Sequence, residues 1–458
     1  MTKLFGTDGI RGTGNSWPLD SMTVAKIGVV LVNWVRAKTD GKKEVNILIG
    51  RDTRESGSRI ESALTAGIGS KGGEVHTVGI MPTPGIAYLT RTNRQIDLGI
   101  VISASHNPAE DNGIKIFNCN GLKLREHEEI EIEQEVQKIE ITDKVTGRAY
   151  ELFDILRNKY KEHLLTVGRS ADGLKHWNPK NYPLQEMKIV IDCANGAASK
   201  IGPELLEELG ANVIALNTET DGKNINNSCG ALHPEAIKKI VIEKKADIGI
   251  TLDGDADRII LLDETGKVID GDEILALCGA WYDGLDKLQG NAVVSTVMSN
   301  IGLKIFLNER EIELKQTKVG DKYVLEEMLL GDYVLGGEQS GHIIFREHST
   351  TGDGLITALQ ILKIMVITRK KISDLITMKK APQILINIPV VAKKNMEQMP
   401  KTTKLIKETE QTLGTKGRVL VRYSGTENKA RVLVEGVAEK QVREIAEKIA
   451  DAIKEEAK

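Results

Sequence analysis

The sequence predicts three tandem α/β domains with mixed sheets, followed by a smaller C-terminal α+β domain. Its 458 residues are too many for one hydrophobic core and correspond to roughly three or four domains of ordinary size. Three regions of the chain repeat one pattern, in which a β-branched strand leads through a Gly- or Asn-bearing turn into a helix. Repeated units of this kind favour parallel or mixed sheets that are covered by helices.

The strands of the repeated pattern are expected at residues 45–49, 188–192 and 292–296. After the second strand, residues 201–210 are typical of a helix, with Pro203 in the first turn and Gly210 at the C-terminal cap. This segment therefore predicts a complete strand and helix unit.

The C-terminal region has a different pattern. Strands are expected at residues 418–422 and 430–434, and a helix follows them. One face of that helix would be formed by apolar residues at helical spacing, namely Val442, Ile445, Ala446, Ile449 and Ile453. The pattern predicts a small α+β domain.

Domain boundaries are expected near residues 149–151, after the aspartate-rich site near Arg258, and near residues 369–371. Residues 172–182 show no periodicity and are expected to form an exposed loop. The four predicted domains are residues 1–150, 151–256, 257–370 and 371–458.

Charge and composition restrict the partners of the protein. With 62 Lys and Arg against 65 Asp and Glu, the net charge is -3, so no overall field attracts nucleic acid or an anionic membrane. Aromatic residues make up only 4% of the chain, which argues against stacking surfaces for single-stranded nucleic acid. Neither a signal peptide nor a membrane span is evident. Because the four cysteines show no zinc or redox spacing, we expect reduced thiols in a cytoplasmic protein without nucleic acid or membrane partners.

Three aspartates at every second position, Asp253, Asp255 and Asp257, predict a metal site. Residues 246–252 before them are typical of a short buried strand, and ligands of α/β proteins bind at strand ends. Three oxygen donors without a nearby Cys or His suit Mg²⁺ better than Zn²⁺, and Arg258 could hold a phosphate beside the ion.

A structural calcium loop is the alternative for this segment. The twelfth residue counted from Asp253 is Glu264, as an EF-hand requires, but the sixth is Arg258 where the loop needs glycine. Strand-like residues 259–262 then follow where a helix-flanked loop should continue. The magnesium interpretation is therefore favoured.

A serine beside a histidine, Ser105 and His106, follows another predicted buried strand at residues 98–102. A serine displayed on a turn next to a base is a candidate nucleophile or phosphate carrier. Lys115 follows a further turn and could act as an acid or base in the same cleft. The structural alternatives are an ordinary Asn-Pro turn and a solvated surface lysine.

Five separated segments occur together in an order that resembles the α-D-phosphohexomutases. They are residues 5–12 (FGTDGIRG), 103–108 (SASHNP), 253–258 (DGDADR), 336–342 (GGEQSGH) and 422–427 (RYSGTE). The resemblance spans nearly the whole chain, and five motifs in the same order are far more specific than any one of them. Within that superfamily, the first and fourth segments look most like those of the phosphoglucosamine mutases.

The resemblance implies that Ser105 is carried as phosphoserine and that Mg²⁺ is bound by Asp253, Asp255, Asp257 and one phosphoserine oxygen. It implies four domains around a central cleft, of which the last closes over the substrate. It also implies an intramolecular phosphotransferase that interconverts glucosamine 6-phosphate and glucosamine 1-phosphate for amino-sugar nucleotide synthesis. Glucosamine 1,6-bisphosphate, or another hexose 1,6-bisphosphate, would be the intermediate and activator.

The remaining site residues are assigned by the same resemblance. Lys115 and His106 are candidates for proton transfer, while Arg11 and Arg258 would support the transferred phosphate. Sugar hydroxyls would be bound by Glu338 and Ser340, with Lys318 reaching the ligand from a neighbouring loop. The non-reacting phosphate would be bound by Arg422, Ser424, Gly425 and Thr426.

Several alternatives remain open at this point. Glycine-flanked residues 336–341 are also compatible with a structural loop, and the 422–427 segment with a Ser-Gly hairpin turn. Tyr423 and Asn428 stand where prolines are common in the glucosamine branch, which leaves the rigidity of that loop open. A glucose or mannose phosphate could be the substrate instead of glucosamine phosphate, and the chain could also form a homodimer. Two further classes are a phosphohydrolase with Asp253 as nucleophile and a sugar-phosphate-binding regulator without turnover.

Overall fold

The computed structural model describes residues 3–6, 8–39, 42–140, 149–170, 183–390, 393–395, 398–423 and 428–457. They divide into two compact units, of which one holds residues 1–297 and 315–376 and the other holds residues 298–314 and 377–458. Three sheets belong mainly to the first unit, and a fourth belongs to the second. The loop predicted at residues 172–182 lies outside the described residues.

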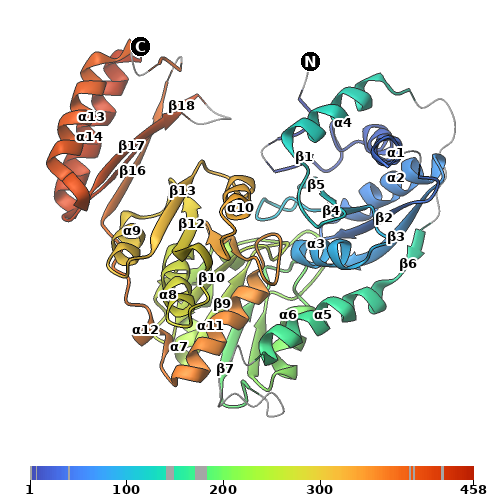
Figure 1. Cartoon of the computed structure of the whole chain (residues 1–458), viewed down its shortest axis with the longest axis horizontal. Coiled ribbons are helices and arrows are strands. Elements are labelled where there is room, and N and C mark those ends of the chain that lie inside the picture. The colour runs from blue at the N-terminus through green and yellow to red at the C-terminus, as the bar shows by residue number, and fades with distance from the viewer. Residues whose placement is uncertain are drawn as a thin grey trace. The chain divides into compact units, whose positions relative to one another are not determined.

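The first sheet has the strand order β1-β5-β4-β2-β3-β6 (Figure 1). Its strands β2, β3, β4 and β6 run parallel, whereas β5 is antiparallel to its neighbours β4 and β1. The strand bounds are β1 Ile10–Thr13, β2 Val45–Arg51, β3 Gly73–Ile80, β4 Leu98–Ile102, β5 Asp111–Asn118 and β6 Ala149–Glu151.

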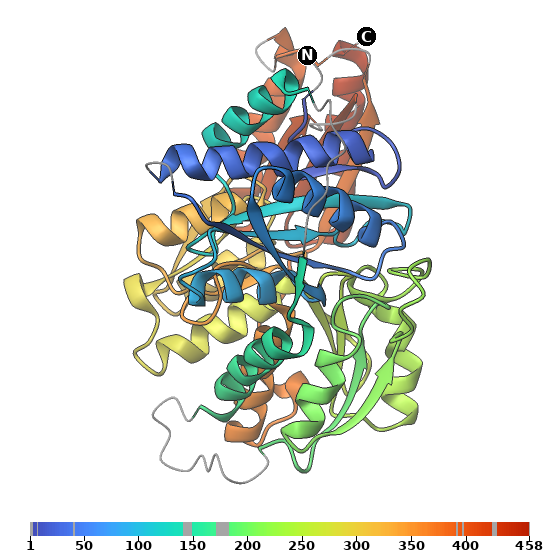
Figure 2. The ribbon, with the colours of Figure 1, turned by 90° about the vertical axis from the view of Figure 1, so that its right-hand side faces the viewer.

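Helices cover both faces of this sheet. On one face, α1 (Ser21–Lys38) packs against α2 (Gly57–Ser70) and α4 (Glu126–Lys138), and their apolar residues share one buried core with the strands. On the other face lies α3 (Thr83–Thr92), as the two ribbon views show (Figures 1 and 2). The sheet is mixed and helix-covered, as the sequence predicts.

The second sheet has the order β11-β10-β9-β7-β8. Strands β9, β7 and β8 are parallel, with β8 at one edge of the sheet, and β9 turns back into antiparallel β10. Helix α6 begins at Ile201 and ends at Glu208, close to the prediction, and Gly210 adopts the expected positive φ of 96°. The bounds are β7 Lys188–Asp192, β8 Asn212–Leu216, β9 Ile248–Leu252, β10 Ile259–Asp263, β11 Val268–Ile269, α5 Phe153–Arg169, α6 Ile201–Glu208 and α7 Lys238–Glu243.

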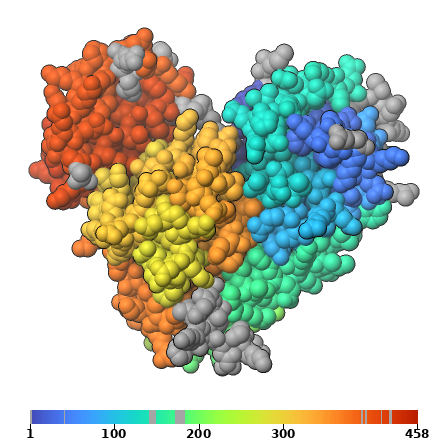
Figure 3. Space-filling model, in the orientation of Figure 1, coloured from blue at the N-terminus to red at the C-terminus, as the bar shows by residue number. Residues whose placement is uncertain are grey.

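The third sheet has the order β13-β12-β14-β15. On the face shown in Figure 3, the yellow-to-orange surface of this part of the first unit meets the blue-to-cyan surface of the first sheet. Hydrogen bonds join the part that holds the third sheet to the part that holds the first. Arg91 donates to the carbonyl of His348, and Thr350 donates to the carbonyl of Gly121. The bounds are α8 Gly271–Asp283, β12 Ala292–Thr296, α9 Ile301–Asn308, β13 Glu313–Thr317, α10 Asp321–Leu330, β14 Leu335–Gly337, β15 Ile343–Phe345, α11 Gly354–Thr368 and α12 Ile372–Leu375.

The second unit contains a small antiparallel sheet with the order β16-β18-β17. Helix α14 (Glu439–Glu456) packs on it, and the predicted apolar face is buried at Val442, Ala446, Ile449 and Ile453. These residues and the strands form a core of their own. The remaining bounds are β16 Gln383–Pro389, α13 Pro400–Leu413, β17 Arg418–Tyr423 and β18 Lys429–Glu435.

Two further features concern the length of apolar helices and the state of the cysteines. In the part of the chain that the structure describes, no helix combines the length and the apolar character needed to cross a membrane. All four cysteines are free.

Candidate active site

Ser105 lies in the turn between β4 and β5. It is 1% exposed, and its φ of 55° is a left-handed conformation that residues other than glycine rarely adopt. Its main-chain N–H donates to Ser103 Oγ at 2.8 Å, and its own hydroxyl donates to Asp253 Oδ2 at 2.6 Å. The turn thus holds one serine oxygen beside a carboxylate of the second sheet.

A buried ion pair that sequence reasoning missed fixes the conformation of this turn. Asp52 and Arg54 follow β2 directly, and both side chains are 0% exposed. Asp52 Oδ2 accepts hydrogen bonds from Ser103 Oγ at 2.6 Å and from Arg54 Nε at 2.9 Å. The guanidinium also donates to main-chain carbonyls of the turn, namely those of Ser105, Asn107, Pro108 and Asp111.

Asp253, Asp255 and Asp257 come together in the turn between β9 and β10, and all three are buried. One carboxylate oxygen from each lies within 4.8 Å of the others. Thr83 at the start of α3 donates its hydroxyl to Asp255 Oδ2 at 2.6 Å and its N–H to the Asp255 carbonyl at 3.0 Å. The cluster is therefore held by both the first and the second sheet.

The chemistry of the cluster fits a divalent cation. Asp255 Oδ1 and Asp257 Oδ1 are buried and accept no hydrogen bond from any described residue. Burial and the neighbouring Asp257 and Asp255 hold the pKa of Asp253 well above its usual range. Buried, mutually repelling oxygens of this kind are unfavourable unless a cation binds them, and oxygen-only ligands suit Mg²⁺.

Lys115 on β5 reaches the same carboxylates. Its Nζ donates to Asp255 Oδ2 at 2.8 Å and to Asp257 Oδ2 at 3.0 Å, and lies 3.5 Å from Asp8 Oδ2. Burial alone would lower the pKa of Lys115, but these three carboxylates outweigh burial and hold the pKa well above its usual value. Lys115 is therefore an ammonium ion in this arrangement, and not the solvated surface lysine of the structural alternative.

His106 and Arg11 border the serine. His106 Nδ1 lies 3.2 Å from Ser105 Oγ. Burial, assisted by the cationic Arg258 and Arg11, lowers the pKa of His106 to about 4, so the imidazole is neutral at neutral pH. Arg11 donates to the Ala104 carbonyl and to Asp8 Oδ2, both at 2.6 Å, which fixes its guanidinium next to the serine turn.

Arg258 completes the turn that carries the aspartates. Its main-chain N–H donates to Asp253 Oδ1 at 3.1 Å. Its Nε lies 3.9 Å from Asp257 Oδ1, is buried, and has no hydrogen-bond partner in the described part of the chain. A guanidinium group with an unused donor beside a predicted metal site is suited to bind a phosphate.

Glu338 and Ser340 lie in the turn between β14 and β15, which packs on the start of β10. Ile259, the residue after Arg258, donates its N–H to the Gly341 carbonyl at 3.0 Å. A Cβ at Gly341, where φ is 88°, would lie 2.0 Å from the Ile259 carbonyl oxygen, so only glycine fits this close approach. Glu338 accepts a hydrogen bond from the Gly320 N–H at 3.2 Å. The turn thereby places these two polar side chains near Arg258.

Further ion pairs surround the cluster. Lys123 pairs with both Asp8 and Asp321, and these carboxylates outweigh burial in raising the pKa of Lys123. His342 Nε2 accepts the Gly352 N–H at 2.9 Å, so its proton lies on Nδ1, which is 3.6 Å from Asp257 Oδ1. These groups tie the third sheet to the first.

Two further predicted substrate contacts are Lys318 in the first unit and Arg422 in the second. Lys318 is exposed after β13, with its Nζ 6.0 Å from the centre of the Tyr323 ring. In the second unit, Arg422 on β17 stands opposite Arg431 on β18, and burial together with Arg431 lowers the pKa of Arg422. Two cations on adjacent strands repel each other unless an anion binds them. The remaining residues of the predicted phosphate loop, Ser424, Gly425 and Thr426, lie outside the described residues.

Four residues that support the site were given no role from the sequence, although residues 224–226, which include Asn226, also resemble the phosphohexomutases. Asn226 donates through Nδ2 to the carbonyls of Ser105 and Asn107 at 2.8 and 3.0 Å. Asp52 and Arg54 directly follow the predicted strand at residues 45–49, so the strand-end argument used for the aspartates applies to them too. Thr83 follows β3 in the same way and lacks any distinctive sequence signal.

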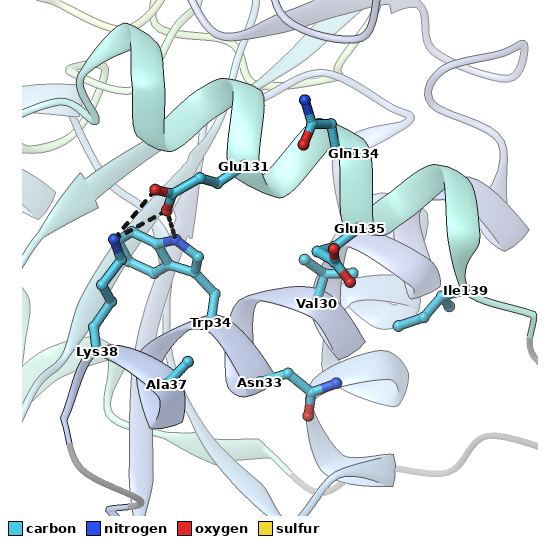
Figure 4. A pocket seen from close by; sticks show the side chains of 9 residues that line it. All are labelled: Val30, Asn33, Trp34, Ala37, Lys38, Glu131, Gln134, Glu135 and Ile139. Carbon is cyan, nitrogen blue, oxygen red and sulfur yellow. Dashed lines mark hydrogen bonds and ion pairs between the residues drawn. The ribbon is translucent and has the colours of Figure 1, made fainter.

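A hollow of about 500 Å³ between α1 and α4 lies elsewhere in the first unit (Figure 4). Glu131 accepts a hydrogen bond from Trp34 Nε1 at 3.0 Å and pairs with Lys38, also at 3.0 Å. The aromatic and charged side chains of this hollow therefore bind one another across the two helices. The hollow contains none of the predicted site residues.

Comparisons with known proteins cover the whole chain. Four domains described for phosphoglucomutase/phosphomannomutase match: α/β/α domain I at residues 2–143, domain II at 171–266, domain III at 270–381 and the C-terminal domain at 385–452. A phosphoglucosamine mutase of Geobacter sp. (strain M21) is 46% identical over 99% of this chain and 98% of its own. A phosphoglucosamine mutase of Myxococcus xanthus is 46% identical over 98% and 96%.

Solved structures share the fold. A phosphoglucomutase/phosphomannomutase family protein of Burkholderia thailandensis has a TM-score of 0.81 at 24% identity and covers 99% of this chain and 97% of its own. An Aspergillus fumigatus N-acetylphosphoglucosamine mutase, solved with GlcNAc-6P and magnesium, has a TM-score of 0.67 at 18% identity over 99% and 96%. On the strength of the four domains and the full-length relatives, the chain belongs to the phosphoglucomutase/phosphomannomutase family of α-D-phosphohexomutases, where it is similar to phosphoglucosamine mutases.

Proposed function

We propose that this chain interconverts glucosamine 6-phosphate and glucosamine 1-phosphate through a phosphoserine at Ser105 and a hexosamine 1,6-bisphosphate intermediate. One observation carries the proposal: a buried, strained serine donates its hydroxyl at 2.6 Å to a carboxylate cluster that fits Mg²⁺. The choice of glucosamine rests on relatives that carry this name at 45–46% identity over nearly the full chain.

The reaction needs one phosphoryl donor that both ends of the sugar can reach. Phosphoserine 105 would transfer its phosphoryl group to the free sugar hydroxyl, whose proton passes to a base. The bisphosphate would then reorient, and its other phosphoryl group would return to the Ser105 oxygen. Transfer of this kind depends on positioning and on neutralisation of charge more than on covalent chemistry.

Asp253, Asp255, Asp257 and an oxygen on Ser105 would hold the Mg²⁺ ion. When bound, the ion supplies neutralisation of the charge on the transferred phosphoryl group. Arg11 and Arg258 would bind the phosphoryl oxygens from the protein side, and the unused Arg258 Nε supports this role.

Lys115 or His106 would transfer the proton at the sugar oxygen. His106 is neutral and its Nδ1 lies 3.2 Å from Ser105 Oγ, so it can accept a proton there. Lys115 is charged while it contacts two aspartates, so in this arrangement it can donate a proton. Lys115 could act as a base only in its neutral form. That form requires the carboxylates of Asp255 and Asp257 to bind the Mg²⁺ ion and no longer stabilise the ammonium group.

The remaining predicted residues would orient the sugar. Glu338 and Ser340 would bind two sugar hydroxyls, and Lys318 would approach the ligand from its exposed position. Arg422 with Ser424, Gly425 and Thr426 would bind the phosphate that is not reacting. The ligand is a small-molecule sugar phosphate, and a hexose 1,6-bisphosphate is the proposed activator. A cytoplasmic location and a homodimer stay predictions.

The decisive experiment concerns Ser105. Purified protein is expected to carry an acid-stable phosphate on Ser105 by peptide mass spectrometry, and Ser105→Ala is expected to lose the phosphate and lower mutase kcat by about a thousandfold or more. The matched control is Ser170→Ala, a serine of the first unit outside the site. An acyl phosphate on Asp253, or release of free phosphate as the main activity, would favour the phosphohydrolase instead.

Substrate choice is tested by comparing kcat/KM for the 6-phosphates of glucosamine, glucose and mannose in a coupled assay. Glucosamine 6-phosphate is expected to rank first. If it ranked last, the proposed substrate would be wrong while the phosphoserine assignment would stand.

A further inference from the structure

A cavity of about 530 Å³ lies within the first unit, between the first and second sheets. Its walls come from Arg51 at the end of β2, residues 78–82 at the end of β3, Phe153 and Arg157 in α5, and residues 197–201 where α6 begins. Thr218 and Thr220, which follow β8, close it. Its volume is in the range of cavities that bind small organic ligands.

Part of the cavity lining is apolar and includes an exposed aromatic residue. Phe153 is 42% exposed and Ile80 is 36% exposed, and Met81, Pro82 and Ile201 line the surface next to them. A flat apolar group such as a nucleobase can stack on such a ring.

The lining also includes cationic residues. These are Arg51, Arg157 and Lys200, and no aspartate or glutamate is among the lining residues. Arg51 Nε pairs with Glu61 at 3.1 Å, and Arg157 pairs with the exposed Asp154 at 3.3 Å.

Donors nevertheless remain in the cavity. In the described part of the chain, the Arg157 Nε is buried without a hydrogen-bond partner, and no ion pair is formed by Lys200. The hydroxyls of Thr218 and Thr220 add further donors, whereas the Ser199 hydroxyl already donates to the Gly196 carbonyl at 2.7 Å. This set of donors is suited to phosphate oxygens.

Two short connections lead from the cavity wall to the aspartate turn. The N–H of Ala197 donates to the Gly254 carbonyl at 2.8 Å, and Thr83, next to Pro82, donates to Asp255. A ligand that shifts either wall would therefore shift the turn that carries the predicted metal ligands. The cavity itself includes none of the residues assigned to catalysis or substrate binding.

We propose that this cavity is a regulatory site for a nucleoside diphosphate or a ligand of the same chemistry. The phosphates would bind Lys200 and Arg157, and the base would stack on Phe153. Occupancy would alter mutase activity through Ala197 and Gly254. The site is separate from the proposed catalytic centre, so UDP binding can be tested without the proposed function, whereas the change of mutase activity rests on that function.

Isothermal titration of the full-length protein with UDP tests the binding, with glucosamine 6-phosphate at saturating concentration so that the active site is filled. One saturable UDP site per chain is expected. Lys200→Glu should weaken UDP binding at least about tenfold, because a charge-assisted contact becomes a repulsion. Thr220→Trp should block binding by filling the cavity without removing a charge.

The matched control is Lys239→Glu, which makes the same charge change on α7 outside the cavity. It should bind UDP as the parent does. Without UDP, Lys200→Glu should keep the parent's mutase activity, which shows that the variant is folded. With UDP, the parent's kcat or KM should change and that of Lys200→Glu should not.

Three results would overturn the proposal. One is the absence of saturable UDP binding at millimolar concentration. Another is equal weakening by Lys200→Glu and Lys239→Glu, which would indicate non-specific attraction of charge. The third is pyrophosphate binding as tightly as UDP, because Phe153 would then contribute nothing. UDP binding that leaves kcat and KM unchanged would contradict the regulatory part.

Discussion

Arg54 shows how a single side chain organises the proposed catalytic turn without touching the substrate. Its guanidinium binds Asp52 and four main-chain carbonyls of the turn that carries Ser105. The geometry matches the rigid fork of arginine, which a lysine ammonium cannot reproduce. The strained φ of Ser105 therefore persists because surrounding hydrogen bonds determine it.

Arg54→Lys is expected to lower both stability and activity. Loss of most of these bonds leaves Asp52 and several carbonyls poorly satisfied, so the free energy of unfolding should fall by about 3–5 kcal/mol. Urea unfolding monitored by circular dichroism measures the stability, and a coupled mutase assay measures kcat. The matched control is Arg36→Lys, whose guanidinium donates to the Lys43 carbonyl at the surface; this variant should change little. Unchanged kcat in Arg54→Lys would contradict the positioning role.

Sequence reasoning worked for residues whose chemistry is visible in their spacing. Asp253, Asp255 and Asp257 alternate at a strand end, and the structure brings them together as a cluster within 4.8 Å. The roles of Arg54 and Asn226 were not predicted, because they act on main-chain carbonyls about 50 and 120 positions away in the sequence. The place of Arg54 after a strand marks it as a candidate, but the partners of such bonds depend on tertiary structure.

At the scale of elements, the predicted strands correspond to β2, β7 and β12, because Val- and Ile-rich runs between turn residues favour buried strands. Helix α6 ends two residues before the prediction, since Leu209 is its cap and Gly210 already lies beyond. The hairpin from β9 to β10 excludes an EF-hand, whose loop is flanked by helices. The pairing of β5 between β4 and β1 could not be predicted, because it depends on contacts distant in sequence.

Helix α11 provides a prediction about pH. Asp353 caps it by accepting the N–H groups of Leu355 and Ile356, each at 3.0 Å, and it also accepts the Tyr160 hydroxyl at 2.7 Å. Burial raises the pKa of Asp353 to about 6, although these hydrogen bonds oppose the shift. The Asp353 carboxyl group therefore binds its proton more tightly in the folded state than in the unfolded chain. The resulting stability is fully present below about pH 4 and is lost as the pH rises through about 6.

Asp353→Asn removes this titration but keeps a good helix cap. Relative to the parent, the variant should gain roughly 2–3 kcal/mol of unfolding free energy between about pH 4 and pH 8. Urea unfolding of both proteins across that range gives the difference directly. A difference that stays constant with pH would show that Asp353 does not titrate in this range.

At the scale of the whole molecule, the chain holds two units with separate hydrophobic cores. One core in the first unit is formed by the first sheet with α1, α2 and α4, and the core of the second unit by β16, β17, β18 and α14. Sequence reasoning anticipated the different C-terminal domain from the strand pattern at residues 418–422 and 430–434 and from the helix that follows. The inclusion of residues 298–314 in the second unit could not be anticipated, because they lie inside a region of α/β pattern.

Separate cores predict that the two units unfold in separate steps, which calorimetry should resolve as two transitions. Ile449 in α14 and Ile100 in β4 are each fully buried in one of these cores. Ile449→Ala should lower the midpoint of one transition and Ile100→Ala that of the other, each by removing about 2–5 kcal/mol. The two variants are matched in chemistry and burial and differ only in the unit that they affect. One transition that both variants lower equally would show that the units unfold together.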